Sequence, residues 1–207
     1  MPLTKHKSDP AAKSDQGSPL SQDEAIELLK SPDPSQRQAA ARSLAGSEPA
    51  AAALCDRFIV EDNAPTREAL AVAIMRTGSR VAVEKLLPLL SSESTPLRNH
   101  VIEILQALPA DVAPHMEELL DNPDSDVRIF AVNILEALRH PKVEDWLIAV
   151  ISTDTHANVV GTALDLLVEV GTKSSIPSLM RVRERFAEEP YLQFAASNAI
   201  QRIGAGS

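Results

Sequence analysis

The sequence lacks several features that would point to particular classes of protein. Its single cysteine, Cys55, cannot form a disulfide within the chain, so stability must come from packing and a reducing, cytoplasmic setting is expected. Aromatic residues make up 3% of the chain, which favours a core of aliphatic side chains. No run of eighteen apolar residues occurs, which argues against a membrane-spanning helix and against a membrane as partner.

The first 19 residues also lack an apolar run, here the one that a signal peptide needs. They are rich in Ser, Pro, Asp and Lys and have little to bury. We therefore expect a disordered tail over residues 1–19 and a folded domain over residues 20–207.

Basic residues are too few to balance the acidic ones. The chain has 20 Lys and Arg against 29 Asp and Glu, a net charge of −9 at pH 7. Such an acidic protein repels phosphate backbones, and the release of counterions that drives nucleic-acid binding does not favour it. DNA and RNA are therefore not expected as partners.

One pattern recurs along the chain at intervals of 30 or 31 residues. Four copies, such as "SPDPSQRQAAARSLAG" and "NPDSDVRIFAVNILEAL", align on an arginine column. Two looser copies follow, with Val160 and Gln193 in that column. The arginine column consists of Arg37, Arg67, Arg98 and Arg128.

Each copy has the periodicity of an amphipathic helix. In the fourth copy Val127, Ala131, Leu135 and Leu138 are spaced by four, four and three residues and share one helical face. A second periodic apolar stretch lies between successive copies, so each unit contains a first helix, A, and a second helix, B. A lone pair cannot cover its apolar side, but stacked pairs can. We predict an all-α fold, a right-handed α-α superhelix of about six helix pairs.

The fourth copy also carries a family resemblance. Its string D-x-D-V-R-x-x-A-x-x-x-L resembles the short HEAT-like repeat that also occurs in phycobilisome-lyase-type proteins. The resemblance covers about residues 20–204. It implies a solenoid whose B helices line the concave side, and it leaves function open because this repeat serves many tasks. The residues that carry it are Asp124, Asp126, Val127, Arg128, Ala131 and Leu135.

The arginine column has two interpretations. In this repeat family such arginines usually form a structural ladder that bonds to carbonyls or carboxylates of the adjoining layer, and we expect that role here; the alternative is an acidic ligand. Nearby polar residues would cap the B helices through free backbone N–H groups. These caps are Asp33, Asn63, Ser94 and Asp124. The ladder should stop after the fourth unit, where capping of the stack would explain the change.

A partner would meet the B-helix positions that point away from the core. Ile129 and Phe194, which flank the small Gly161, would then seat a partner's side chain; alternatively the register is shifted by one and both belong to the core. Trp146 aligns with polar A-helix positions and is expected to be an exposed anchor, with burial between A helices as the alternative. The candidate partner-binding residues are Glu68, Asn99, Glu103, Ile129, Asn133, Asp165, Phe194, Asn198 and Trp146.

Catalytic signatures are weak. The five histidines are scattered, and a single pair such as His115 and Glu118 is more typical of polar side chains in contact with solvent than of a metal site. Cys55 falls in an apolar column and is expected to be a buried hydrophobe. No phosphate loop, nucleophile elbow or paired carboxylates appear. We expect no catalytic residue, no metal and no cofactor.

The sequence thus favours a non-enzymatic scaffold or adaptor that binds a protein or peptide through its B helices. The alternative that the resemblance allows is a bilin-lyase-like, chromophore-handling enzyme. A HEAT-like DNA-repair glycosylase is a third class, against which the acidity and the single tryptophan count. The oligomeric state stays open.

Overall fold

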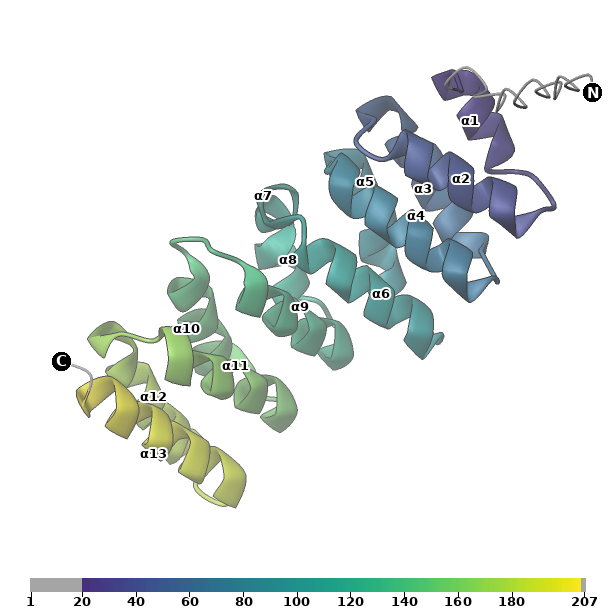
Figure 1. Ribbon diagram of the computed structural model, residues 1–207. Coiled ribbons are helices and arrows are strands. Elements are labelled where there is room, and N and C mark those ends of the chain that lie inside the picture. Colours follow the sequence, from purple (N-terminus) through teal and green to yellow (C-terminus); the bar gives the residue numbers. More distant parts are fainter. Residues whose placement is uncertain (1–19, 206–207) are drawn as a thin grey trace, which may run out of the picture.

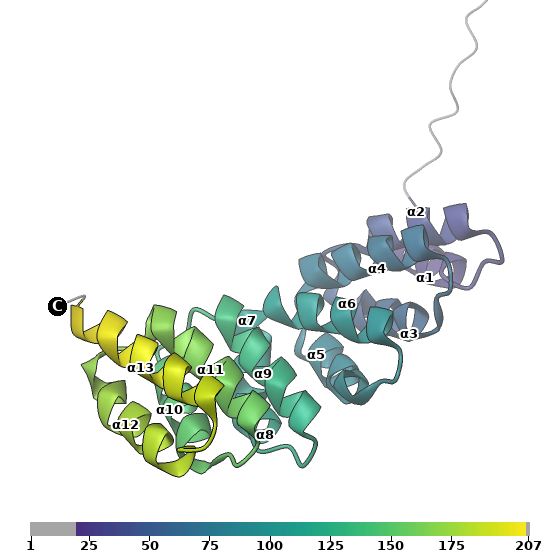
Figure 2. The same cartoon turned by 90° about the horizontal axis from the view of Figure 1, so that it is seen from below.

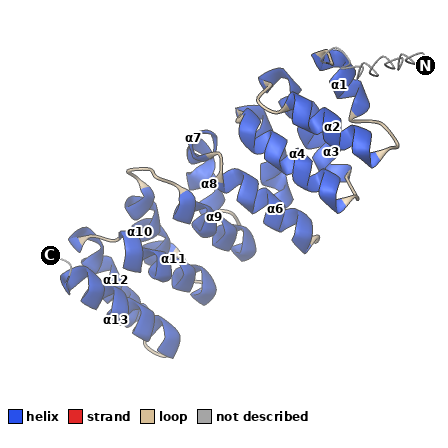
Figure 3. Ribbon diagram, in the orientation of Figure 1, coloured by secondary structure: helices blue, strands red, loops and turns tan. Residues whose placement is uncertain are grey.

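The computed structural model describes residues 20–205. The predicted tail over residues 1–19 lies outside the described residues. Within residues 20–205 the regular structure is helical and contains no strand (Figure 3). The predicted all-α fold is confirmed.

The helices form two rows that run the length of the molecule (Figures 1 and 2). The B row contains α2 (Pro34–Leu44), α4 (Ala64–Thr77), α6 (Thr95–Gln106), α9 (Ser125–Ala137), α11 (Ala157–Val170) and α13 (Pro190–Ala205). The A row contains α1 (Gln22–Leu28), α3 (Ala51–Val60), α5 (Arg80–Leu86), α7 (Pro109–Val112), α8 (Met116–Leu120), α10 (Val143–Thr153) and α12 (Ile176–Arg185).

Successive units stack in chain order. In the B row α2 contacts α4, α4 contacts α6, α6 contacts α9, α9 contacts α11, and α11 contacts α13. In the A row α3 contacts α5, and α10 contacts both α8 and α12. The predicted solenoid of helix pairs is therefore present. Across residues 20–205, no helix combines the length and apolar character needed to cross a membrane.

Proline breaks the two central A helices. The α5 helix passes into a 3₁₀ segment, Leu87–Ser91, at Pro88, and α7 is joined to α8 by a 3₁₀ segment, Ala113–His115, that contains Pro114. Proline lacks a backbone N–H and its ring crowds the carbonyl four residues earlier, so the α-helical ladder cannot continue through it. The B helices lack such interruptions and form the more regular row.

Three of the four predicted caps are confirmed. The side chains of Asp33, Asn63 and Asp124 accept hydrogen bonds from backbone N–H groups in the first turns of α2, α4 and α9. Ser94 precedes α6, but its side chain makes no such bond. At the other end of α4, Gly78 takes a positive φ of 51°, a conformation that favours glycine over residues with a Cβ.

The core is one continuous layer of aliphatic side chains between the rows. Alanines such as Ala40, Ala71 and Ala131 are fully or almost fully buried and allow helices to approach closely. The apolar face predicted for the fourth unit, Val127 to Leu138, is buried throughout. Each layer therefore completes its core with residues of its neighbours.

Leu135 provides a test of this packing. It is 1% exposed on α9, and Leu135→Ala should lower the free energy of unfolding by about 2–5 kcal/mol because it leaves a cavity. Chemical denaturation measures this change. Met180→Ala, at an apolar position that is 55% exposed, is the control and should change the same quantity by less than about 0.5 kcal/mol. Equal effects of the two substitutions would contradict the assigned core.

Candidate functional site

The outer side of the B row is the candidate site. Most of the predicted partner-binding residues lie on this side and are exposed to solvent. We define the B surface as these exposed residues of successive B helices. They are Glu68 on α4, Asn99 and Glu103 on α6, Asp165 on α11, and Phe194 and Asn198 on α13. Ile129 and Asn133 on α9 are half-buried between them.

Ile129 and Phe194 differ in environment. Ile129 packs partly against the core, whereas Phe194 is 70% exposed. A shift of register by one residue, which would have buried both, is therefore excluded for Phe194. An aromatic side chain with this much of its surface exposed to solvent contributes little to the stability of the fold and is available to contact another molecule.

The space over Gly161, beside the positions at which Ile129 and Phe194 are expected to seat a partner's side chain or short helix, is occupied within the chain. A Cβ built on Gly161 would come within 2.8 Å of the Tyr191 ring, so Tyr191 of α13 already fills this space. The Tyr191 hydroxyl donates a 2.6 Å hydrogen bond to Asp165 Oδ2 on α11. Hydrogen bonding to Asp165, with some burial, raises the pKa of Tyr191 to about 12. Glycine at 161 therefore permits a contact inside the protein.

The prediction of an exposed Trp146 is also wrong, because its side chain is only 7% exposed. The indole stacks on His140 with ring centroids 5.0 Å apart and an interplanar angle of 14°. Its Nε1 donates a 3.4 Å hydrogen bond to Glu117 of α8. The alternative that the sequence left open, burial between A helices, is therefore confirmed. Trp146 is not an exposed anchor for a partner.

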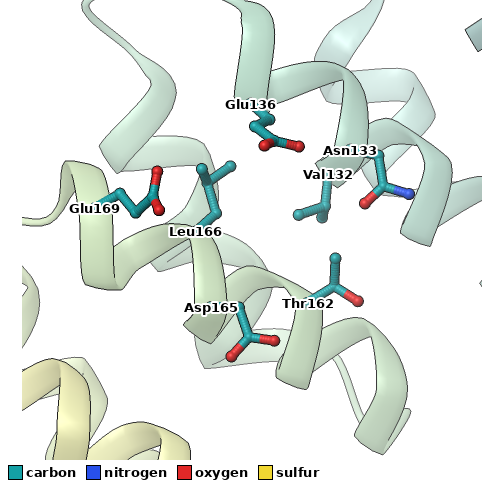
Figure 4. A pocket seen from close by; sticks show the side chains of 7 residues that line it. All are labelled: Val132, Asn133, Glu136, Thr162, Asp165, Leu166 and Glu169. Atoms are coloured by element: carbon teal, nitrogen blue, oxygen red, sulfur yellow. The ribbon is translucent and has the colours of Figure 1, made fainter.

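A groove of about 210 Å³ lies between α9 and α11 (Figure 4). The apolar side chains of Val132 and Leu166 are flanked by the carboxylates of Glu136 and Glu169, while Asn133 and Thr162 lie toward the other end. Asp165 completes the lining and joins the groove to Tyr191. Sequence reasoning identified Asn133 and Asp165 but missed Glu136, Thr162 and Glu169, because their proximity depends on how two helices are set against each other.

The predicted arginine ladder is present, and each arginine binds the loop that leads into its own B helix. Arg37, Arg67, Arg98 and Arg128 each donate to the backbone carbonyl six residues earlier. These acceptors are the carbonyls of Ser31, Glu61, Ser92 and Asn122. The arginines thereby satisfy carbonyls between the two helices of each layer, where no helical hydrogen bond is available.

Two of the ladder arginines also bind a carboxylate of the next layer. Arg37 donates from Nε and Nη2 to both carboxylate oxygens of Glu61, at 2.8 and 2.7 Å. Arg128 donates in the same way to Asp154, at 2.7 and 3.2 Å. Both carboxylates also accept the N–H of the residue two positions later. A carboxylate at this place therefore caps its own loop and holds the preceding layer.

The two middle rungs lack this carboxylate. Ser92 and Asn122 occupy the places that correspond to Glu61 and Asp154, six residues before the column position of their own layer. The Nε atoms of Arg67 and Arg98 are buried and have no hydrogen-bond partner among the described residues. Arg98 instead stacks on Phe130, with its guanidinium carbon 5.1 Å from the ring centroid. In the described part of the chain, the arginine–carboxylate bridge between layers is therefore absent at these two middle junctions.

The column of arginines ends after the fourth unit, as expected, and the last two layers are held differently, because other residues bind the loop carbonyls there. Val160 replaces the arginine in the fifth layer, and Arg185, from the end of α12, donates to the carbonyls of Ile151, Ser152 and Asp154. In the sixth layer Gln193 Nε2 donates to the carbonyls of Arg183 and Phe186. Arg185 lies outside the repeat register, so no sequence alignment of the repeats could have found it.

A family model of HEAT repeats matches residues 22–106 and 112–200. This protein belongs to the HEAT repeat family. The HEAT units coincide with the A and B helices described above. A comparison with curated proteins finds no match.

Solved structures of repeat proteins resemble the chain at low identity. The crystal structure of one engineered protein is 17% identical, with a TM-score of 0.42, over 90% of this chain and 97% of that chain. That of a second engineered protein is 20% identical, with a TM-score of 0.47, over 89% of this chain and 98% of that chain. The complex of CpcE and CpcF of phycocyanin lyase from Nostoc sp. is 18% identical, with a TM-score of 0.38, over 95% of this chain and 100% of that chain.

Glu61, the ladder carboxylate that Arg37 and Arg57 of this HEAT protein bind, has a strongly lowered pKa. Burial acts to raise the pKa of Glu61, but hydrogen bonds from Arg37, Arg57 and the Asn63 backbone outweigh it and lower the pKa to about 2. The Glu61 side chain is fully buried. By contrast, burial raises the pKa of the Cys55 thiol to about 12, which keeps it protonated and confirms Cys55 as a buried core residue. These perturbed groups lie inside the fold rather than on the B surface.

Replacing Glu61 should destabilise the HEAT stack strongly. Glu61→Gln leaves two arginines without their carboxylate and should cost about 3–5 kcal/mol at pH 7. Because the pKa in the folded state lies below the ordinary 4.5, the stabilisation by the ion pair is complete above pH 4.5 and is lost as the pH falls toward 2. Denaturant unfolding of both proteins from pH 7 to 2.5 checks this. A difference between them that does not change with pH would contradict it, and Glu48→Gln, at an exposed position, is the control.

Adding the missing carboxylate should stabilise the middle of the stack. Ser92→Asp would keep the existing hydrogen bond to the Ser94 N–H and offer an oxygen to Arg67 Nε, as Asp154 does for Arg128. We expect a gain of about 1 kcal/mol in the free energy of unfolding. Combination with Arg67→Met should abolish the gain, and Ser91→Asp, which adds the same charge one residue earlier, should not reproduce it. A gain that survives Arg67→Met would disprove the pairing.

Proposed function

We propose that this HEAT repeat protein is a non-enzymatic scaffold that binds a protein or peptide partner on its B surface. The observation that supports this proposal is the exposure of Phe194, an aromatic side chain on the last B helix that is 70% exposed to solvent. Exposed aromatic residues that the fold does not need are typical anchors of interfaces. Stacked helix repeats present such residues on an extended surface that suits protein ligands.

The chemistry of the described residues supports binding rather than catalysis. Each carboxyl group with a lowered pKa in the described part of the chain is bound by a neighbour: Glu61 and Asp154 by ladder arginines, Glu117 by Lys142 and Trp146, and Glu24 by Ser21. Cys55 is buried in the core. Two of these carboxylates, Glu117 and Asp154, line a pocket of about 200 Å³, but both already accept hydrogen bonds from neighbouring side chains of the fold. The reduced, buried Cys55 fits a cytoplasmic location.

The test compares two exposed apolar positions in the same terminal layer. Phe194→Asp, on the B surface, should weaken capture of a protein partner from cell lysate by about tenfold or more, the scale of an interface anchor. Met180→Asp on α12 of the A row is the matched control, since Met180 is 55% exposed, and should leave capture unchanged. Quantitative mass spectrometry of the captured proteins gives the ratio. Partners that persist with Phe194→Asp, or that disappear equally with both variants, would refute the B surface.

A bilin-handling activity is tested with the same protein. Addition of an open-chain tetrapyrrole should leave its absorption spectrum unchanged if the scaffold proposal is correct. A spectral change that depends on intact HEAT repeats would favour the enzymatic alternative.

A further inference from the structure

Charge is unevenly distributed along the B row. The first two B helices, α2 and α4, each expose a basic residue, Arg42 and Arg76. The next three, α6, α9 and α11, expose no Lys or Arg, and their exposed charged residues are all acidic. The exposed charges on the two helices that form the groove, α9 and α11, are therefore acidic, and the exposed Arg139 follows α9 in the next loop.

Of the three carboxylates of this groove, Asp165 binds Tyr191, whereas Glu136 and Glu169 do not serve the fold. Glu136 and Glu169 lie in the last turns of α9 and α11, where the helix dipole disfavours negative charge. Asp165 and Glu169 are four residues apart on one helix face, and such like-charged pairs are destabilising. Among the described residues Glu136 and Glu169 have no hydrogen-bond or salt-bridge partner. The arrangement is unfavourable for the isolated protein and would be relieved by a cation.

The floor of the groove suits a long side chain. Leu166 is 9% exposed and Val132 is 1% exposed, so the apolar floor between the carboxylates is small and belongs mainly to Leu166 (Figure 4). A lysine or arginine side chain has an apolar stem and a charged head, which match this floor and the carboxylates respectively. The groove volume of about 210 Å³ accommodates side chains rather than a whole folded element.

The groove is continuous with the exposed aromatic surface of α13. Asp165 lines the groove and accepts the hydrogen bond of Tyr191, and Tyr191 and Phe194 lie three residues apart on α13. Tyr191 and Phe194 are 55% and 70% exposed. An extended segment that places a basic side chain in the groove therefore meets apolar rings next to it, which attract both apolar groups and cations.

We propose that the groove between α9 and α11, with Tyr191 and Phe194 beside it, binds a basic segment of the partner protein. Lysine or arginine stems lie over Val132 and Leu166, and their cationic heads pair with Glu136 and Glu169. An apolar or cationic neighbour in the segment contacts Phe194. This proposal rests on the proposed function and specifies the chemistry of the partner.

The experiment measures binding of labelled peptides to the full chain by fluorescence anisotropy. The probes are a peptide of alternating lysine and alanine, its arginine counterpart, and the same peptide with glutamine in place of each lysine. Glu136→Gln/Glu169→Gln should weaken binding of the basic peptides by about tenfold or more. Binding to the unmodified protein should also weaken as salt is raised.

The matched control removes the same charge elsewhere. Glu93→Gln/Glu188→Gln alters two exposed glutamates in loops between A and B helices and should change affinity by less than about threefold. Equal weakening by the two double variants would overturn the proposal, since net charge alone would then attract the peptide. Equal binding of the glutamine peptide would overturn it too. The unfolding midpoint of Glu136→Gln/Glu169→Gln should not fall, which separates lost binding from lost folding.

The proposed function and this inference can fail separately. If a captured partner is lost with Phe194→Asp but kept with Glu136→Gln/Glu169→Gln, the groove proposal is wrong and the scaffold proposal stands. If the partner is kept with both, both proposals fail. Self-association of the protein that Phe194→Asp abolishes, measured by sedimentation, would make a second copy the occupant of this surface and also overturn the groove proposal.

Discussion

Each layer of this protein buries its apolar side against the next layer, and a single pair of helices has too little interior to be stable alone. The core is consequently one continuous layer of mainly aliphatic side chains between two rows of helices. Thin layers favour Leu, Ile, Val and Ala over large rings, in agreement with the low aromatic content of the chain. The same constraint places residues that are about 30 positions apart side by side on the outer surface, so any binding surface is built from several repeats.

Loops between the A and B helices present a second problem, because they carry carbonyl groups that no helix can satisfy. Arginines of the B helices solve it in four layers, and Arg185 and Gln193 solve it in the last two. Where a carboxylate is also available, as at Glu61 and Asp154, the arginine additionally joins two layers. In the middle of the stack the carboxylate is missing, and the buried Nε atoms of Arg67 and Arg98 are without a partner among residues 20–205. The arginine–carboxylate bridge between layers is thus present at some junctions of the stack and absent at others, although the units are similar.

The B surface and the groove between α9 and α11 contain residues that this framework leaves unused. Glu136 and Glu169 sit at helix ends that disfavour them, and Phe194 keeps most of its ring in water. Such features cost stability and gain nothing inside the chain, whereas Arg128 of α9 bonds to both Asp154 and the carbonyl of Asn122. The contrast between an optimised interior and an unfavourable outer patch supports a role for that patch in binding a complementary, basic partner.

The sequence by itself determined the repeat period, the helical pairs, the arginine ladder and three helix caps, because each of these depends on residue spacing within one unit. The spacing of Val127 to Leu138, for example, already specifies a buried face. Only the tertiary structure decided that Tyr191 fills the space over Gly161, that Trp146 is covered by His140, and that Arg185 replaces an arginine of another helix. It likewise brought Glu136 and Glu169 together. These contacts join side chains of different units, and their geometry depends on the relative rotation and spacing of packed helices, which the pattern within a repeat does not encode.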